Sequence, residues 1–272
     1  MKIEVTHVSR LDYDGDVVES VMDLRLGPLD DADQDVPEFN LRVQPDGHIR
    51  RYSDGLGNVA HLLTSTQPHR YLELTMRCCV ETLLEDPFAA PTRAPAPLTP
   101  IELVDALDPS PLVPDCPALS TLAEPFRGLD PFEAARKMSS MIYDQFAYRQ
   151  GVTDVTTTVE QILEHRAGVC QDFAHLLIGL CRVLRIPARY VSGYVASTGD
   201  RHRGAGASHA WVEAYTPTHG WRGFDPTNNL VANTRYVKIA RGRDYADVPP
   251  TRGTFRGAAN ESLQVSVTAR AV

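Results

Sequence analysis

The chain has 272 residues, of which 43% are hydrophobic, and its 27 basic and 35 acidic residues give a net charge of −8. This length is enough for the buried core of one large domain or of two ordinary ones. Because the sequence has no long run or stripe of basic residues, its composition argues against binding to nucleic acid or to an anionic membrane surface.

The beginning of the chain and its cysteines bear on the cellular compartment. The segment MKIEVTH lacks the apolar core of a signal peptide, and the apolar runs are too short to span a bilayer, so we expect a cytoplasmic protein. The five cysteines are odd in number and contain no C-x-x-C pair, which favours a reducing compartment over a disulfide framework or a zinc site. Adjacent Cys78 and Cys79 are most simply buried small residues.

Residues 1–86 are predicted to form an N-terminal β-domain, because runs of alternating or β-branched residues are separated there by turn residues. The dipeptide Asp14-Gly15 predicts a hairpin. The expected strands are Ile3–Tyr13, Val17–Leu26, Phe39–Val43, His48–Tyr52, Val59–Thr64 and Tyr71–Thr82. We expect them to form a small structure like a β-sandwich.

Residues 87–117 contain nine prolines, a density that predicts an extended connector without regular helix. A second domain is therefore expected over residues 118–272. There Asp130 and Pro131 are typical of a helix start, and apolar residues recur at helical spacing to about Tyr148. Thr158 and Gln161 resemble a capping box for a short helix that ends near His165.

The next predicted helix begins at Cys170 and stops before Ile186-Pro187, because proline cannot continue a helix. Antiparallel strands are expected after it, at Arg189–Ala196, Ser208–Tyr215, Trp221–Phe224, Tyr236–Ala240 and Leu263–Ala269. The predicted fold class is thus α+β, with a β-sandwich-like domain followed by a helix packed on an antiparallel sheet.

Cys170 is the strongest candidate for a nucleophile. The first N–H groups of a helix have no intrahelical partner and the helix dipole is positive at that end, so a thiolate is favoured there. Gly168 lets the backbone pass close to this cysteine. A buried core cysteine is the alternative, and it is how we interpret Cys181.

Two further residues can complete a triad with this cysteine. His209, on a predicted strand, can hold the thiolate as an ion pair and later protonate a leaving group. Asp225 ends the next strand, and an antiparallel pair would place its carboxylate beside the imidazole. Asn228 or Asn229 could replace Asp225 as the partner of the histidine, since Asp before Pro is also a common turn.

Several motifs together resemble the bacterial transglutaminase-like cysteine protease family of the papain-like superfamily. They are Gly168-Val-Cys-Gln-Asp-Phe-Ala-His175, Arg189-Tyr-Val-Ser-Gly-Tyr194, Ser208-His-Ala-Trp211, Gly220-Trp221 and Phe224-Asp-Pro-Thr227. The resemblance covers about residues 130–250 and extends to the N-terminus through Arg25-Leu26, Gln34, Phe39 and Asp54 to Asn58. It implies that Cys170 is the nucleophile, His209 the general base and acid, and Asp225 the orienting carboxylate of a papain-like core.

Other polar and aromatic residues are assigned more modest parts. Asp172 and His175 lie three apart on one helix, but a third metal ligand at suitable spacing is missing, so we predict no metal and no cofactor. They are expected to make supporting hydrogen bonds or to lie on the helix surface. Trp211 and Trp221 are interpreted as core residues. Tyr148, Gln150 and Gln161 are candidates for a second oxyanion donor.

The predicted reaction is acyl transfer through a thioester, with a peptide or protein amide as the substrate and the Cys170 N–H as one oxyanion donor. Hydrolysis is the first prediction. A protein-glutamine transglutaminase and a non-catalytic binding module on the same fold are the alternatives. The segment from Thr198 to Ala207 is a candidate for a specificity loop. The sequence identifies neither the substrate nor the oligomeric state.

Overall fold

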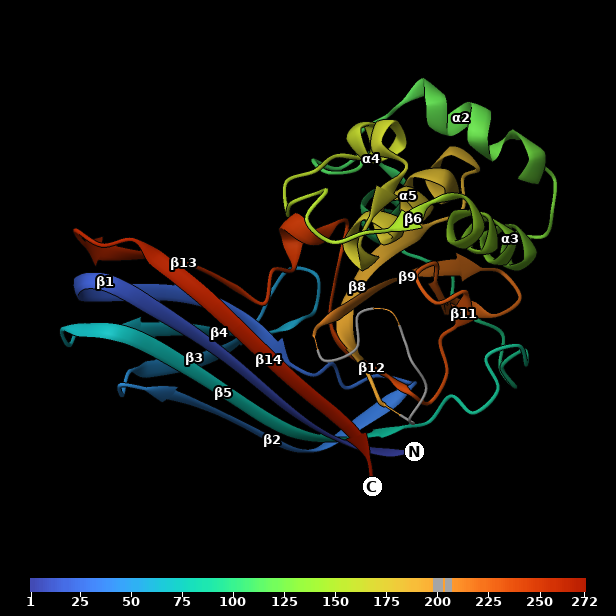
Figure 1. The fold of residues 1–272 in the computed structure, drawn as a ribbon. Coiled ribbons are helices and arrows are strands. Elements are labelled where there is room, and N and C mark those ends of the chain that lie inside the picture. The colour runs from blue at the N-terminus through green and yellow to red at the C-terminus, as the bar shows by residue number, and fades with distance from the viewer. Residues whose placement is uncertain (198–202, 204–206) are drawn as a thin grey trace.

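A computed structural model describes residues 1–197, 203 and 207–272 of the chain. The first sheet has the strand order β2-β5-β1-β4-β3, and β13 and β14 also pair with β1. Its strands are β1 (Lys2–Gly27), β2 (Gln34–Gln44), β3 (His48–Ser53), β4 (Val59–Ser65), β5 (His69–Thr82), β13 (Thr251–Gly257) and β14 (Glu261–Ala271). Figure 1 shows these long strands gathered on the left of the molecule.

Strand β1 belongs to two layers of this β-domain. Its first half pairs with β5 and β14, and its second half pairs with β4 and β13. The two layers pack on each other through buried Leu11, Leu24, Leu63, Leu72 and Leu74. The expected sandwich is therefore present, and one long strand runs through both of its layers.

The hairpin predicted at Asp14-Gly15 is wrong, because β1 continues through these residues and its halves do not pair with each other. The backbone N–H of Asp14 donates to the carbonyl of Asn260 over 3.2 Å, and the Asp14 carboxylate accepts from the Asn260 side chain over 2.7 Å. Pairing with strands far along the chain thus overrides the local turn signal.

The expected place of the C-terminal strand is also wrong. Residues 263–269 lie in β14, where Leu263 pairs with Leu11 and Ala269 with Val5, and so they belong to the first sheet. The structure thereby moves the end of the chain out of the expected 118–272 core. The two termini are side by side, since the Val272 N–H donates to the Lys2 carbonyl over 3.0 Å (Figure 1).

The proline-rich connector contains a helix, which the sequence interpretation excluded. Helix α1 (Pro100–Leu107) begins with a proline at a position that needs no N–H donor. Thr99 and Glu102 cap it, since the Thr99 N–H donates to the Glu102 carboxylate over 2.8 Å. The prolines of this connector are therefore incompatible with the interior of a helix but compatible with its first residue.

The second domain contains a sheet with the order β11-β10-β9-β8-β12. Its strands are β8 (Ala188–Val195), β9 (His209–Thr216), β10 (Gly220–Asp225), β11 (Leu230–Val231) and β12 (Tyr236–Gly242). The helices are α2 (Pro117–Ala123), α3 (Pro131–Gln145), α4 (Val159–His165) and α5 (Cys170–Val183), with 3-10 turns at Glu124–Phe126 and Tyr245–Asp247. Two short parallel strands, β6 (Ala147–Tyr148) and β7 (Ala167–Gly168), lie beside α5.

This sheet lies between the helices and the β-domain. Helices α3 and α5 cover one face, where Phe173, Leu177 and Val212 share a buried apolar core. On the other face, Tyr194 and Val237 pack against the first sheet. Figure 1 shows the helices on the far side of β8 and β9 from the long strands. The α+β fold with a helix packed on an antiparallel sheet is as predicted.

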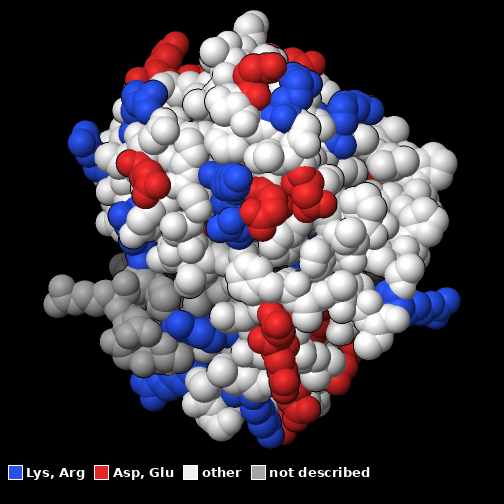
Figure 2. Space-filling view, turned by 90° about the vertical axis from the view of Figure 1, so that its right-hand side faces the viewer, with Lys and Arg blue, Asp and Glu red and all other residues white. Residues whose placement is uncertain are grey.

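The surface carries interspersed charges of both signs on the face shown in Figure 2. No helix among the described residues is long and apolar enough to cross a membrane.

Candidate active site

Cys170 is the first residue of α5 and is partly exposed. Its backbone N–H therefore has no intrahelical acceptor. The turn before it is fixed by Asp172, whose Oδ2 accepts from the Val169 N–H over 2.7 Å and from the Thr153 hydroxyl over 2.6 Å. A Cβ atom at Gly168 would lie 2.5 Å from this Oδ2, so glycine is required there for a different reason than the backbone contact that we expected.

His209 begins β9 and Asp225 ends the neighbouring strand β10. The Nε2 atom of His209 lies 2.8 Å from Oδ2 of Asp225, and both side chains are buried. The strand register pairs Phe224 with Val212, so the carboxylate reaches the histidine across the end of the ladder. The structure thus brings these two residues together as the sequence predicted.

Asp225 is surrounded by hydrogen-bond donors. Its Oδ1 accepts from the backbone N–H groups of Thr227 over 2.9 Å and Asn228 over 3.2 Å. Its Oδ2 accepts from the Asn228 amide and from the Tyr236 hydroxyl, each over 2.9 Å. Burial opposes the charge of this carboxyl, but His209 and these donors outweigh burial and lower its pKa.

Asn228 and Asn229, the alternative partners of His209, make other hydrogen bonds in the structure. Asn228 Nδ2 lies 3.5 Å from His209 Nε2 and holds the carboxylate, while Asn229 Oδ1 accepts from the Ser140 hydroxyl over 2.8 Å. Tyr236 was missed in the sequence. Tyr236 is the first residue of β12, and no pattern in the sequence predicts that this strand begins beside Asp225.

The electrostatics of His209 favour the charged ring. Burial lowers the pKa of His209. The Asp225 carboxylate and the Cys170 thiol raise it by more than burial lowers it, and the net result is a pKa of about 10. Because Nε2 faces Asp225, Nδ1 is the ring nitrogen left for a hydrogen bond with Cys170. The imidazolium is therefore the favoured form of His209 at neutral pH, with Asp225 at Nε2 and Sγ of Cys170 at Nδ1.

The other cysteines differ from Cys170 in their surroundings. All are free thiols; Cys78, Cys79 and Cys181 are buried and Cys116 is partly buried. Burial raises the pKa of Cys78 and of Cys181 to about 12, which opposes thiolate formation. The predictions of buried small residues at these positions are confirmed.

Of the candidate oxyanion donors, Tyr148 lies beside the cysteine. Its backbone pairs with Gly168 in the β6–β7 ladder, and its side chain packs against the same core as Cys170. Gln150 is exposed, and its side chain lowers the pKa of Tyr148 against the effect of burial. Gln161 is engaged elsewhere, because its Oε1 accepts from the Thr158 N–H over 2.8 Å as the cap of α4.

The remaining singled-out residues support the site or its surroundings. His175 Nε2 accepts from the Tyr245 N–H over 3.1 Å, and burial lowers the His175 pKa to about 4. Asp172 and His175 thus make separate hydrogen bonds. Trp211 is buried as expected, and its ring stacks on His209 with centroids 6.3 Å apart. Most of the Thr198–Ala207 loop lies outside the described residues.

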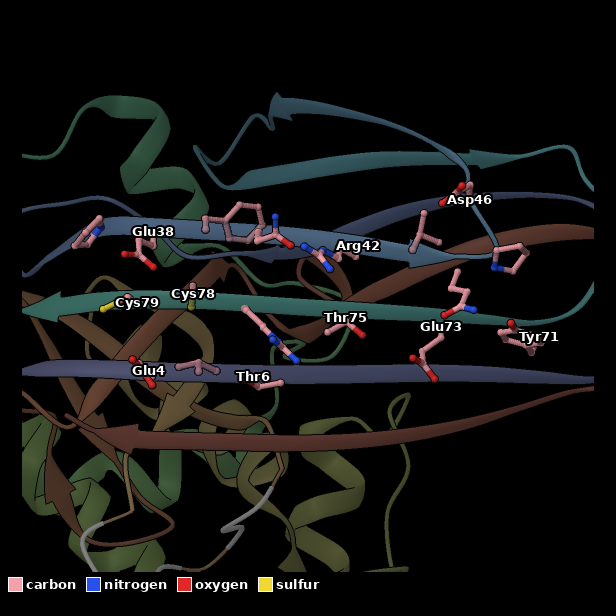
Figure 3. Close-up of a pocket in the computed structure, with 18 of the residues that line it drawn as sticks. Glu4, Thr6, Glu38, Arg42, Asp46, Tyr71, Glu73, Thr75, Cys78 and Cys79 are labelled. Carbon is pink, nitrogen blue, oxygen red and sulfur yellow. The ribbon is translucent and has the colours of Figure 1, made fainter.

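A hollow of about 1310 Å³ lies elsewhere, on the outer face of β1, β2 and β5. Figure 3 shows it lined by side chains of both charges, among them Glu4, Glu38, Arg42 and Glu73. None of the candidate triad residues lines it.

Two family models match this chain. The transglutaminase-like superfamily matches residues 120–226, and the bacterial transglutaminase-like N-terminal region matches residues 3–81. An uncharacterised protein of Mycobacterium tuberculosis, Rv2569c, is 35% identical over 98% of this chain and 91% of its own length. The chain therefore belongs to the transglutaminase-like superfamily, with the N-terminal region of its bacterial members.

Two further relatives have functional descriptions. A Cytophaga hutchinsonii protein provisionally described as a cysteine protease has a crystal structure that matches with a TM-score of 0.79 and 27% identity, over 100% of this chain and 91% of that one. A protein-glutamine gamma-glutamyltransferase of Pseudomonas aeruginosa is 32% identical over 42% of this chain and 19% of its own length. These likenesses support cysteine-dependent chemistry in general, with a peptide or protein as the substrate.

Proposed function

We propose that the protein is a cysteine-dependent hydrolase, a peptidase or an amidase, that acts through a thioester with Cys170, His209 and Asp225 as its catalytic triad. One observation carries the proposal. A buried imidazole, bonded to a carboxylate over 2.8 Å and with its pKa raised to about 10, interacts with Cys170, a partly exposed cysteine at the N-terminus of α5.

In the first half of the reaction, Sγ of Cys170 attacks the amide carbonyl carbon. The oxygen becomes an oxyanion that the Cys170 N–H stabilises, and the Tyr148 hydroxyl supplies the second hydrogen bond. The C–N bond then breaks as His209 gives its Nδ1 proton to the departing amine. A thioester remains.

In the second half, neutral His209 takes a proton from water, and the resulting hydroxide attacks the thioester. The carbonyl re-forms, the acid leaves, and the thiolate is restored beside the imidazolium. Throughout, Asp225 holds the Nε2–H tautomer and stabilises the ring charge. The donors around Asp225 keep the carboxylate ionised and in place.

A transglutaminase is the second candidate. An amine would replace water at the thioester, and the described likeness to a gamma-glutamyltransferase favours this possibility. The likeness to a protein described as a cysteine protease covers the whole chain, and for this reason we place hydrolysis first.

One experiment separates these functions. The protein is incubated with a peptide library and a labelled primary amine, and both cleavage and amine incorporation are followed by mass spectrometry. Cys170→Ala should abolish both activities, while Cys116→Ala, which removes another partly buried thiol, should leave them unchanged. Incorporation above hydrolysis would replace the proposal with a transglutaminase. The absence of both products would favour a binding module.

A further inference from the structure

Arg203 is tied to the candidate site through the residue that holds its carboxylate. The Arg203 backbone N–H donates to Oδ1 of Asn228 over 3.0 Å, and the Asn228 amide donates to Asp225 over 2.9 Å. The backbone of Arg203 is therefore fixed two hydrogen bonds away from the His209 partner.

The Arg203 side chain lies over aromatic rings on the Tyr148 side of the site. Its Cζ is 4.3 Å from the centroid of the Tyr143 ring and 6.0 Å from that of the Tyr148 ring. Tyr148 in turn packs against the core that Cys170 contacts. Burial and Cys170 raise the pKa of Tyr148, while Arg203 lowers it, so the Tyr148 phenol is close enough to Cys170 and to Arg203 to interact electrostatically with each. The cation and the nucleophile thus share one neighbour.

The guanidinium lacks an anionic partner. Its Nη1 is buried without a hydrogen-bond partner, and it forms no ion pair with a carboxylate of the described residues. Two other arginines differ, since Nη1 of buried Arg182 donates to the Ser110 hydroxyl and the partly buried Arg189 pairs with Glu213. A buried donor without an acceptor is costly, and a guanidinium is suited to a carboxylate because its fork of N–H groups can bind both oxygens.

We propose that Arg203 forms a subsite for a substrate carboxylate, so that the preferred substrates carry this group close to the amide that Cys170 attacks. The inference rests on the proposed function of Cys170. The N–H groups of a guanidinium lie in its plane, so stacking on Tyr143 leaves them free of the ring, and a bound carboxylate would face them within that plane. The carboxylate can belong to a chain terminus or to an acidic side chain.

The test uses reagents that alkylate Cys170 and differ in charge. N-bromoacetylglycine carries a terminal carboxylate, N-bromoacetyl-aspartic acid α-amide carries a side-chain carboxylate, and N-bromoacetylglycinamide is neutral. The wild type should favour one of the acids over the neutral reagent, and that acid identifies the source of the group. In Arg203→Gln this preference should fall about three- to tenfold, while the neutral rate stays within about twofold.

Two variants act as controls. Arg149→Gln removes an exposed charge one residue beyond Tyr148 and should keep the preference, while Arg203→Lys keeps the charge but loses the fork and should keep only part of it. An equal preference in the wild type and Arg203→Gln would overturn the subsite. So would an equal loss in Arg149→Gln, or a loss of the neutral rate in Arg203→Gln.

A second measurement does not depend on Cys170. Phenylglyoxal modification of Arg203, followed by mass spectrometry, should be slowed by glutarate and not by glutaramide. If Cys170 proves unreactive but glutarate protects Arg203, the subsite stands and the proposed function fails. If Cys170 reacts and glutarate gives no protection, the subsite is overturned while the proposed function stands.

Discussion

At the scale of single residues, the pair formed by His209 and Asp225 sets the protonation of the site. The carboxylate is buried, and His209 together with donors from Thr227, Asn228 and Tyr236 keeps it ionised against the effect of burial. A fixed negative charge at 2.8 Å favours the imidazolium. The charged ring can then stabilise negative charge on Sγ of Cys170 when the sulfur attacks.

Asp225→Asn should lower the pKa of His209 from about 10 toward its ordinary range, because the ring loses the carboxylate charge. Alkylation of Cys170 at about pH 6 should slow roughly tenfold, and its pH profile should move to higher pH. Asp225→Ala should be more severe, since it also leaves buried donors without an acceptor. Thiol-labelling rates and circular dichroism are measured together. An unchanged profile in Asp225→Asn would contradict the orienting role.

Gly168→Ala tests the turn before the nucleophile. The new Cβ would lie 2.5 Å from Oδ2 of Asp172, so this carboxylate must move and its bond to the Val169 N–H weakens. We expect a loss of about 1–3 kcal/mol in the free energy of unfolding and slower labelling of Cys170. Gly55→Ala is the matched control, because no atom lies within 4 Å of its added Cβ. Equal urea midpoints for both variants would refute this reading of Gly168.

At the scale of elements, the β-domain and the core sheet are joined by an ion cluster around the buried side chain of Lys238. Lys238 Nζ, on β12, lies 2.6 Å from Asp31, 3.0 Å from Asp33 and 3.3 Å from Glu213. Gln34 adds neutral bonds, since its side chain donates to the Lys238 carbonyl and accepts from the Lys238 N–H. The same strand carries Tyr236, so the cluster helps to position the hydroxyl that donates to Asp225.

Lys238→Met should destabilise the protein by about 1–3 kcal/mol, because it leaves the partly exposed Asp31 and Asp33 without their cation and Glu213 with Arg189 alone. Arg70→Met breaks an exposed pair of 2.6 Å with Asp16 and should cost at most about 1 kcal/mol. Urea unfolding of both variants measures the difference. If the two losses were equal, the cluster would have no special part in joining the domains.

The elements that the sequence predicted correctly are those set by local signals. Asp130 caps α3 by accepting from the Phe132 N–H over 3.0 Å, and Gln161 caps α4. The motifs around Cys170 and His209 also begin their elements where expected. Caps and periodicity act over a few residues, so a single sequence carries them.

The elements that were predicted wrongly depend on distant partners. The continuous β1 and the placement of β14 follow from pairing between the two ends of the chain, which turn signals cannot reveal. The same reason applies at the site. Tyr236 and Arg203 come from other segments, so the sequence supplied Cys170, His209 and Asp225 but not the groups around them.

At the scale of the whole molecule, buried histidines limit stability at both acid and alkaline pH. Burial lowers the pKa of His7 and His175 to about 4, below the 6.5 expected on unfolding, so their contribution is present above pH 6.5 and lost as the pH falls toward 4. His209 has the opposite sign. Its contribution is present below pH 6.5 and lost as the pH rises toward 10. Stability should therefore be greatest near neutral pH.

His7→Gln tests the acid side of this curve. Glutamine can still bond to the Tyr194 hydroxyl, which lies 2.7 Å from His7 Nδ1, but it cannot take up a proton. Between pH 6.5 and 4, the free energy of unfolding should fall less steeply in the variant, by up to about 1 kcal/mol per pH unit. Urea unfolding at several pH values measures this slope. Parallel curves for the two proteins would contradict the assignment.

The central claim is that Cys170 is an activated nucleophile, and the most direct measurement is brief labelling with iodoacetamide at about pH 6 followed by mass spectrometry of each cysteine. Cys170 should react at least about tenfold faster than Cys116, the other partly buried thiol, and His209→Ala should remove this advantage. Cys78, Cys79 and Cys181 should stay unlabelled in the folded protein. Equal labelling of Cys170 and Cys116, or labelling of Cys170 only after unfolding, would contradict the claim.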